Sequence, residues 1–368
     1  MKFSIPQSRL VGPLQLISGA VEKRQTLPVL ANLLLKVEKG LLSITATDLE
    51  IEMSVNIILE ADSVDGDITV PARKLVDICR SLPVDSEINI ELVKGKLSVK
   101  CGRSRFTLST ILAQEFPNIE DSLFTTEFAI SSSSLKNTID KTQFAMAQQD
   151  VRYYLNGMLI ELDQNKLLTV ATDGHRLALS SLTLNTSMSE DLLQVIIPRK
   201  GVLEASKLLS SIEGEAIVSL NNNHIRINLG QFVFTSKLVD GRFPDYGKVL
   251  PKNADRILIC TKDSIKEAFS RASILCNEKF RGVRLTLSEK KLRINANNPE
   301  QEEAEIELDV EYNDKEMEIG FNVSYLLDAV NAIKSNDVKF CLGDSNSSVL
   351  IESTDGSDSS YVVMPMRL

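Results

Sequence analysis

Asp173, His175 and Arg176 stand together in the segment Ala-Thr-Asp-Gly-His-Arg-Leu (171–177), where an acid, a base and a cation crowd into one turn. An aspartate beside a histidine can orient the imidazole as a general base, so this segment is the candidate for a hydrolytic site. The chain has one other histidine, and it contains no Gly-x-x-x-x-Gly-Lys-Ser/Thr loop, Gly-x-Ser-x-Gly elbow or His-Glu-x-x-His helix. We therefore interpret Asp173 as a turn residue and His175-Arg176 as a surface feature. We expect no enzyme activity, no catalytic residue, no metal and no cofactor.

The elements around this turn recur along the chain. The strings Leu-Leu-Ser-Ile-Thr-Ala-Thr-Asp (41–48), Leu-Leu-Thr-Val-Ala-Thr-Asp (167–173) and Leu-Arg-Ile-Asn-Ala-Asn-Asn (292–298) carry alanines at 46, 171 and 296, which are 125 residues apart. A period of this length corresponds to a whole small domain rather than to a solenoid repeat. We predict three copies of one domain, at residues 1–124, 125–253 and 254–368.

Each copy has the same predicted elements. A short strand, an amphipathic helix, several strands, a second helix and further strands follow one another. Ile265, Phe269 and Ile274 have helical spacing and are predicted to face the core. The fold class is α+β, with each domain an internally duplicated unit of helix and antiparallel sheet. The predicted helices occupy the windows 8–25, 72–82, 134–154, 199–212, 262–281 and 322–335.

Composition places the chain among ordinary globular proteins. It has 43% apolar residues, its first residues lack the apolar run of a signal peptide, and no stretch is apolar and long enough to span a bilayer. The five cysteines have no Cys-x-x-Cys spacing, which is typical of buried thiols in a reducing compartment rather than of disulfides or a zinc site. We predict a cytoplasmic protein that does not bind membranes.

Charge is unevenly distributed. The formal net charge is −9, yet Lys and Arg outnumber Asp and Glu by 18 to 9 within the six helical windows, so the remainder carries −18. Basic helices at regular intervals on an acidic body are typical of a surface that faces phosphates, although helix surfaces in general favour Lys and Arg. No base-reading module is present, so such a surface would hold duplex DNA by its backbone, without regard to sequence.

Two further segments indicate contacts with other proteins. In the apolar C-terminus, Tyr361-Val-Val is predicted to form a last strand, and the methionines beyond it suit an adaptable groove for peptides. The acidic run 299–309 is predicted to be an edge strand, and Gly-Arg-Ser-Arg-Phe-Thr-Leu (102–108) offers a basic counterpart in the first copy. Pairing the third copy of one molecule with the first copy of another gives a head-to-tail contact that can close into a ring.

Over its whole length the chain resembles a known family, the bacterial DNA polymerase III beta subunit or beta sliding clamp. The similar strings include Thr47-Asp-Leu-Glu, Pro71-Ala-Arg-Lys, Gly102-Arg-Ser-Arg-Phe, Gln149-Asp-Val-Arg-Tyr-Tyr-Leu-Asn-Gly-Met, Ala171-Thr-Asp-Gly-His-Arg-Leu, Asp240-Gly-Arg-Phe-Pro-Asp-Tyr and Met364-Pro-Met-Arg-Leu. The resemblance implies a DNA sliding clamp, a processivity factor that encircles duplex DNA as a head-to-tail homodimeric ring, with helices inside and a continuous sheet outside. It tethers the replicative polymerase and other replication and repair proteins through a peptide-binding groove.

The resemblance also implies residues for three sites. The DNA contacts are Arg24, Arg73, Gln149, Tyr153, Tyr154, Arg199 and Lys200. The groove for partner peptides consists of Leu155, Thr172, Gly174, His175, Arg176, Leu177, Pro244, Lys248, Val249, Val362, Val363, Met364, Pro365, Met366, Arg367 and Leu368. The dimer interface joins Arg103 and Arg105 of the basic strand with Lys74, Phe106, Leu108, Ile274, Leu275, Glu300, Glu302 and Glu303.

The implied partners are duplex DNA, a second copy of the chain, the DNA polymerase III alpha subunit, the clamp loader delta subunit, and other clamp-motif proteins such as translesion polymerases, mismatch repair proteins and ligase.

Two positions depart from the family pattern. Lys248 stands where relatives carry arginine, which removes a planar fork of donors from the groove. Ile306 interrupts the acidic run, which predicts a slightly weaker ionic interface.

Two other functions compete with the clamp. A hydrolase centred on Asp173 and His175 would lose its activity in the variant His175→Ala while DNA loading stayed intact. A monomeric, nonspecific DNA-binding protein would be retained equally on linear and on circular DNA.

Overall fold

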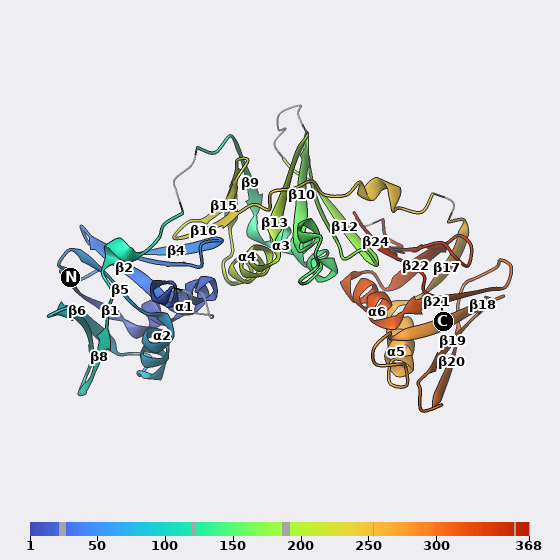
Figure 1. Cartoon of the computed structure of the whole chain (residues 1–368), viewed down its shortest axis with the longest axis horizontal. Coiled ribbons are helices and arrows are strands. Elements are labelled where there is room, and N and C mark those ends of the chain that lie inside the picture. The colour runs from blue at the N-terminus through green and yellow to red at the C-terminus, as the bar shows by residue number, and fades with distance from the viewer. Residues whose placement is uncertain (22–26, 120–122, 186–191, 253, 357, 368) are drawn as a thin grey trace. The chain divides into compact units, whose positions relative to one another are not determined.

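The computed structural model describes residues 1–21, 27–119, 123–185, 192–252, 254–356 and 358–367, and it divides into two compact units (Figure 1). Unit 1 comprises residues 1–136 and 200–238, and unit 2 comprises residues 137–199 and 239–368. The division passes through the second copy of the repeat, because each half of that copy extends a sheet of a neighbouring copy. The domain boundaries proposed from the sequence stay a prediction.

The same order of elements recurs in each copy. The first copy contains β1 (Lys2–Pro6), α1 (Gln7–Ile17), β2 (Asn32–Glu38), β3 (Leu41–Thr47), β4 (Ile51–Ile58), β5 (Gly66–Pro71), α2 (Ala72–Ser81), β6 (Glu87–Val93), β7 (Lys96–Cys101) and β8 (Ser104–Ser109). The second contains β9 (Thr126–Ser131), α3 (Ser132–Asp140), β10 (Gly157–Asp163), β11 (Lys166–Thr172), β12 (Arg176–Thr183), β13 (Leu193–Pro198), α4 (Arg199–Ser211), β14 (Glu215–Leu220), β15 (His224–Leu229) and β16 (Phe232–Lys237). The third contains β17 (Arg256–Thr261), α5 (Lys262–Ala272), β18 (Gly282–Ser288), β19 (Lys291–Asn297), β20 (Glu303–Asp309), β21 (Met317–Asn322), α6 (Val323–Ala332), β22 (Asp337–Leu342), β23 (Val349–Ser353) and β24 (Ser359–Val363).

The strands form two antiparallel sheets in each unit. Unit 1 has the orders β5-β2-β3-β4-β16-β15-β14-β9 and β1-β6-β7-β8. Unit 2 has the orders β13-β10-β11-β12-β24-β23-β22-β17 and β20-β19-β18-β21. The larger sheets are continuous across two copies, because β4 pairs with β16 and β12 pairs with β24. β8 and β20 end their sheets, and for β20 this confirms the predicted edge strand.

The period of the apolar residues explains these elements. Along β4 every second residue from Ile51 to Ile57 is buried, which gives the strand one face in the core. Along α1 the buried residues Leu10, Leu14 and Ile17 recur at helical spacing. In unit 1 this face packs against α2, β1, β3 and β4, and in unit 2 α5 packs in the same way against α6, β19 and β20. Burial of each such side chain contributes about 1.5–3 kcal/mol. No helix in the described part of the chain has the length and hydropathy to cross a bilayer.

Several predicted helical windows extend beyond the helices. After α5 the chain turns at Asn277, whose side-chain oxygen accepts hydrogen bonds from the N–H groups two and three residues further on, at 2.9 and 3.0 Å. Ile274 lies past the end of α5 and is 76% exposed, so the prediction that it faces the core was wrong. Lys141 and Lys279, which contributed to the charge of the windows, follow the helices instead of lying on them.

Candidate functional site

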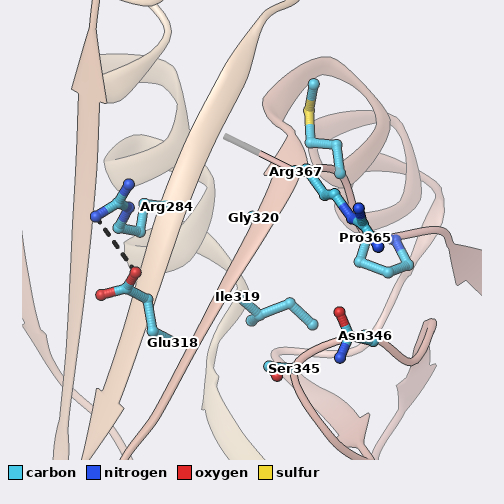
Figure 2. A pocket seen from close by; sticks show the side chains of 9 residues that line it. Arg284, Glu318, Ile319, Gly320, Ser345, Asn346, Pro365 and Arg367 are labelled. Atoms are coloured by element: carbon cyan, nitrogen blue, oxygen red, sulfur yellow. Dashed lines mark ion pairs between the residues drawn. The ribbon is translucent and has the colours of Figure 1, made fainter.

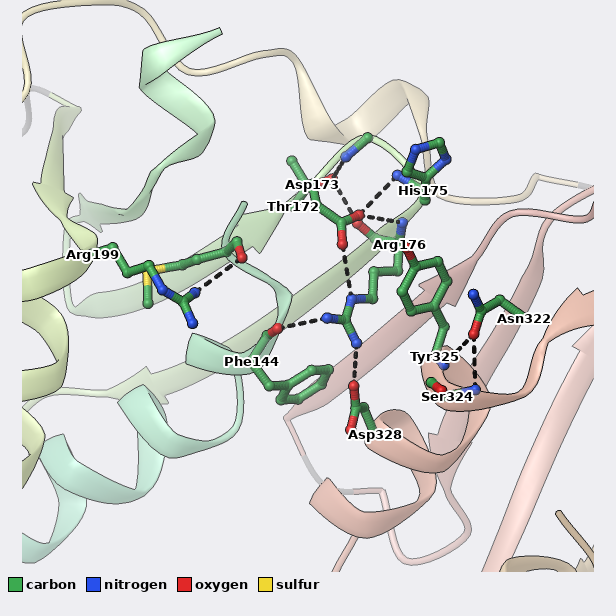
Figure 3. A network of polar contacts seen from close by, with 12 residues as sticks. Phe144, Thr172, Asp173, His175, Arg176, Arg199, Asn322, Ser324, Tyr325 and Asp328 are labelled. Carbon is green, nitrogen blue, oxygen red and sulfur yellow. Dashed lines mark hydrogen bonds and ion pairs between the residues drawn. The ribbon is translucent and has the colours of Figure 1, made fainter. Parts of the chain in front are cut away.

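The turn between β11 and β12 is built around the carboxylate of Asp173 (Figure 3). Its Oδ1 accepts hydrogen bonds from the N–H groups of His175, at 2.9 Å, and of Arg176, at 3.1 Å. The His175 imidazole instead lies against the ring of Tyr325, with the ring centroids 6.3 Å apart and the planes at 16°. The aspartate thus caps a turn and does not orient the imidazole, so the geometry of an Asp-His base is absent at this site.

Arg176 connects this turn to the third copy. Its guanidinium donates to Asp173 Oδ2 at 3.1 Å, to the Phe144 carbonyl at 2.8 Å, and to the Asp328 carboxylate on α6 (Figure 3). The guanidinium carbon lies 4.5 Å from the centroid of the Tyr325 ring, within the range of a cation–π contact. The side chain is 13% exposed, so the expectation that Arg176 is a surface residue was wrong. Three acceptors around the guanidinium compensate for its loss of contact with water.

The C-terminal segment crosses the start of β12. β24 pairs with β12 and ends at Val363, as the sequence predicts, because the proline that follows cannot extend a ladder. Beyond it the Met364 N–H donates to the His175 carbonyl at 2.9 Å, and the Met366 N–H donates to the Gly320 carbonyl at 2.9 Å. The backbone of the segment is therefore fixed at both ends, while Met364 and Met366 remain partly exposed.

An apolar cluster lies where β10, β11, β12, β13 and β24 meet the connection after β16. Its buried members are Leu159, Val170, Leu177, Ile196, Phe243 and Val362, and Tyr154, Tyr246, Val249 and Leu250 pack against them. Among the predicted groove residues the cluster thus brings together Leu177, Val249 and Val362.

The remaining groove residues lie on the segments around this cluster. Thr172 Oγ1 donates to the Arg176 carbonyl at 2.6 Å and accepts from the Gly174 N–H at 3.1 Å. Leu155 is buried in the 3-10 turn Tyr153–Leu155. Pro244 and Lys248 are exposed, and the Lys248 ammonium lies 3.2 Å from the Asp245 carboxylate. Leu368 falls outside the described residues.

A buried carboxylate, that of Glu161 on β10, contacts the connection after β16. Glu161 accepts hydrogen bonds from the Tyr246 hydroxyl at 2.8 Å and from the Gln194 amide at 2.5 Å. Burial of the Tyr246 ring, together with its hydrogen bond to Glu161, raises the pKa of that hydroxyl, which therefore stays protonated and keeps donating at neutral pH. A cavity of about 710 Å³ opens beside these residues, on the side of Arg242 to Lys248.

A second cavity, of about 320 Å³, lies beside the C-terminal segment (Figure 2). Pro365, Met366 and Arg367 form one side of it, and residues of β18, β21 and the turn after β22 form the rest: Arg284, Glu318, Ile319, Gly320, Ser345 and Asn346. Arg284 and Glu318 form an ion pair of 3.3 Å within this lining. These residues of the third copy were not among the predicted site residues. No motif marks them, because they come from separate strands that only the fold brings to the C-terminus.

The residues predicted to contact DNA have different environments. The side chain of Arg73 on α2 is 95% exposed, and Gln149 and Tyr153 are also exposed. Tyr154 packs against the apolar cluster, and the Arg199 guanidinium donates to the Met146 carbonyl at 3.1 Å (Figure 3). In unit 1 the Lys200 ammonium forms an ion pair with Asp48. Arg24 lies outside the described residues.

The residues predicted for the dimer interface lie on the two edge strands and beside them. On β8, Arg105 is exposed and Leu108 is buried, with Phe106 partly buried on the same face as Leu108. Arg103 lies in the turn before this strand, and Lys74 is exposed on α2. In unit 2 Ile274 is exposed, Leu275 is partly buried, and the glutamates at 300, 302 and 303 are exposed.

Ile306 does not interrupt the acidic surface of β20. Exposed and half-buried residues alternate along this strand, so Ile306 shares a face with Ala304 and Leu308, whereas Glu305 and Glu307 point to the other face. The expectation that this isoleucine weakens an ionic interface stays a prediction. The acidic face is partly neutralised within the sheet, where Lys291 lies 2.6 Å from Glu307.

Comparisons with known proteins agree with this geometry. Models of the DNA polymerase III beta subunit match the chain in three parts: the N-terminal domain at residues 1–120, the central domain at 129–245 and the C-terminal domain at 247–367. Beta sliding clamps of Pseudomonas aeruginosa and Escherichia coli K12 are 56% and 53% identical over the full length of both chains.

Solved structures are equally similar. A crystal structure of the DNA polymerase sliding clamp from Pseudomonas aeruginosa covers both chains completely with a TM-score of 0.97 at 56% identity. The sliding clamp of Bartonella birtlesii, bound to griselimycin, also covers both chains completely with a TM-score of 0.96 at 38% identity. The chain therefore belongs to the DNA polymerase III beta subunit family, the beta sliding clamps.

Proposed function

We propose that two copies of this chain, a non-catalytic processivity factor of DNA polymerase III, assemble head to tail into a ring around duplex DNA. The observation that carries the proposal is that the repeat provides three equivalent pairs of strands, of which only two are formed within the chain. β4 is joined to β16 and β12 is joined to β24, whereas their third counterparts, β20 and β8, are both sheet edges. An edge strand presents unpaired N–H and C=O groups, and a second copy supplies the missing strand on each side.

The repeat also gives the register of the missing pair. Met53, Ala178 and Ala304 are equivalent, because each lies opposite the repeated alanine of the preceding strand. Phe234 of β16 pairs with the first of these residues, and Tyr361 of β24 pairs with the second. The remaining pair should bring together equivalent residues in the same register.

On β8 the aromatic residue equivalent to Phe234 is Phe106, since each lies at the same place in its hairpin. In the assembled dimer Phe106 then lies opposite Ala304, and the neighbouring Arg105 lies opposite Glu305. This register pairs opposite charges across the new ladder, which is the favourable arrangement for cross-strand neighbours. The exposed Ile274 adds an apolar contact that an isolated chain leaves in water.

Reversing the charge of the basic strand tests the interface. We expect the double variant Arg103→Glu, Arg105→Glu to dissociate at concentrations where the wild type is dimeric, and the wild-type dimer to weaken with salt. Light scattering and sedimentation equilibrium measure both effects. The double variant Lys39→Glu, Lys94→Glu, in exposed turns of the same unit, is the control and should stay dimeric. An unchanged dissociation constant in the first variant would remove the arginine pair from the interface.

For DNA, we propose contacts with the backbone through residues spread over several helices and turns. Arg73, Gln149 and Tyr153 are exposed and available for such contacts, whereas Lys200 would have to share its charge with Asp48. Contacts of this kind hold any sequence and allow sliding. The measurement is retention of the loader-assembled protein on a nicked circular plasmid, before and after a single cut. Release on linearisation is expected for a ring, and unchanged retention would favour the monomeric DNA-binding protein instead.

For partner proteins, we propose that a short apolar peptide binds over Leu177, Val249 and Val362, between the C-terminal segment and the connection after β16. Met364 and Met366 can change rotamer to fit different side chains, which suits a groove that serves several partners. The expected partners are the polymerase alpha subunit, the clamp loader delta subunit, translesion polymerases, mismatch repair proteins and ligase. A cytosolic location follows from this role.

A further inference from the structure

The turn after the third strand of each copy carries a capping side chain at one repeated position. Asp48 and Asp173 accept hydrogen bonds from the N–H groups two and three residues further on, at 2.8 to 3.1 Å. In the third copy Asn298 takes this position, and its Oδ1 accepts from the N–H of Glu302 at 2.9 Å. The three capping residues therefore hold the same place in the repeat, but the third turn is longer and its capping residue is uncharged.

Between the first and second copies this turn is tied to a helix. The ammonium of Lys200, in the first turn of α4, forms an ion pair with Asp48, whose side chain is 3% exposed. The repeat gives this lysine an equivalent on α2: Lys200 follows Pro198 by two residues, and Arg73 follows Pro71 by two residues. The two prolines also hold the same place in their sheets, opposite the first residues of β10 and β2.

Among the described residues of unit 1, Arg73 forms its ion pair with a residue of its own helix and not with such a turn. Its guanidinium lies 3.9 Å from the exposed carboxylate of Asp77, and the side chain is 95% exposed. The turn of the third copy has the complementary property. The Asn298 amide donates to the Glu302 carboxylate at 2.6 Å, and this hydrogen bond holds a negative charge next to the capping residue of the third copy. Both groups are exposed and opposite in sign.

We propose that in the head-to-tail dimer Arg73 of one protomer forms an ion pair with Glu302 of the other, beside Asn298. The inference rests on the proposed dimer, which places the third copy of one chain against the first copy of the other. It assigns Arg73 to the junction between protomers, in addition to the DNA contact implied by the resemblance. This ion pair between protomers would correspond to the Lys200–Asp48 ion pair, which joins the second copy of the repeat to the first within one chain.

A charge swap tests the pair. Sedimentation equilibrium of the full chain at moderate salt should show that Arg73→Glu raises the dimer dissociation constant about tenfold or more, within the range measured for close charge pairs at interfaces. Glu302→Arg should have a similar effect, and the double variant Arg73→Glu, Glu302→Arg should recover most of the lost affinity. Arg80→Glu, an exposed arginine in the last turn of the same helix, is the control and should leave the dimer unchanged.

The outcomes separate the inference from the dimer itself. If Arg73→Glu leaves the dissociation constant unchanged while Arg103→Glu, Arg105→Glu weakens the dimer, the interface stands and the new pair is wrong. If the swap restores nothing, Arg73 acts on a group other than Glu302, which also overturns the pair. A wild-type chain that stays monomeric at every concentration would instead refute the proposed ring. Thermal unfolding followed by circular dichroism checks that each variant is folded.

Discussion

The Arg176 contacts allow a quantitative test of how the second and third copies are held together in unit 2. In Arg176→Met the side chain stays unbranched and largely apolar but becomes shorter, and the donors to Asp173, Asp328 and the Phe144 carbonyl are lost. Two carboxylates then remain next to each other without their shared cation. The expected result is a large loss of stability with the fold retained.

The magnitude follows from burial. Removing one partner of a buried ion pair costs about 3–5 kcal/mol. Arg176 is 13% exposed, but Asp328 is 43% exposed and regains water when the arginine is removed, which lowers the cost. We expect a loss of about 3 kcal/mol, the lower end of that range. For a folding unit of this size, such a loss lowers Tm by roughly 6–12 °C.

Circular dichroism is the appropriate probe for this test, because the chain contains no tryptophan. Arg284→Met is the matched control: its ion pair with Glu318 spans 3.3 Å and both side chains are about half exposed, so its removal should cost less than about 1 kcal/mol. In Asp328→Asn the Arg176 side chain keeps its other acceptors, and an intermediate shift is expected. Equal shifts for Arg176→Met and Arg284→Met would refute the reasoning from burial.

Three further predictions concern the groove and its surroundings. Tyr246→Phe removes the donor to the buried carboxylate of Glu161 but keeps the ring, so it should weaken the binding of an apolar peptide several-fold, as measured by fluorescence anisotropy. Tyr312→Phe is the control and should bind normally, because its hydroxyl bonds to a backbone carbonyl elsewhere in unit 2. Equal affinities for the two variants would show that the Tyr246 hydroxyl does not position the proposed groove. Deleting residues 364–368 should abolish polymerase stimulation but leave the dimer intact in light scattering, and loss of the dimer would contradict the separation of groove and interface. Hydrogen bonds from the side chain and backbone of Arg152 lower the pKa of Asp150 to about 2, so the stability from this contact is present above the ordinary pKa, near 4, and is lost as pH falls through about 2. Carboxyl NMR should show that midpoint, and Arg152→Met should move it upward; a midpoint near 4 in the wild type would contradict the contact.

Local periodicity was sufficient for much of the fold. The repeated alanines, the alternation along the strands and the proline after Val363 correctly predicted the order of elements, the antiparallel sheets and the end of the last strand. These features depend on residues close in sequence. The end of α5 did not follow from periodicity, since Ile274 has helical spacing but the helix ends at Ala272, and the Ile274 N–H bonds to the Arg271 carbonyl, three residues back, at 3.2 Å.

The candidate site was predictable only in part, because much of it depends on distant residues. Arg176 was predicted to be a surface residue next to a turn, but it is largely covered and bonds to Asp328 on α6, which lies 152 residues away. The Tyr246 hydroxyl and Glu161 come together in the same way across 85 residues. Cavity residues such as Asn346 carry no local signal. The family resemblance supplied the predicted groove residues, but it did not indicate which contacts hold them.

The two open edges have a consequence for how many copies an assembly contains. β8 and β20 are different surfaces of one chain, so every copy that joins at one edge leaves the other edge free until the assembly closes on itself. In the proposed assembly the edges let chains join, whereas the rotation between successive chains decides whether the product is a closed ring or an open helical filament. We therefore expect the connections between the three repeats of one chain to influence whether the assembly closes. An insertion there, at residues remote from both edges, can turn a finite ring into a fibre without changing a single interface contact.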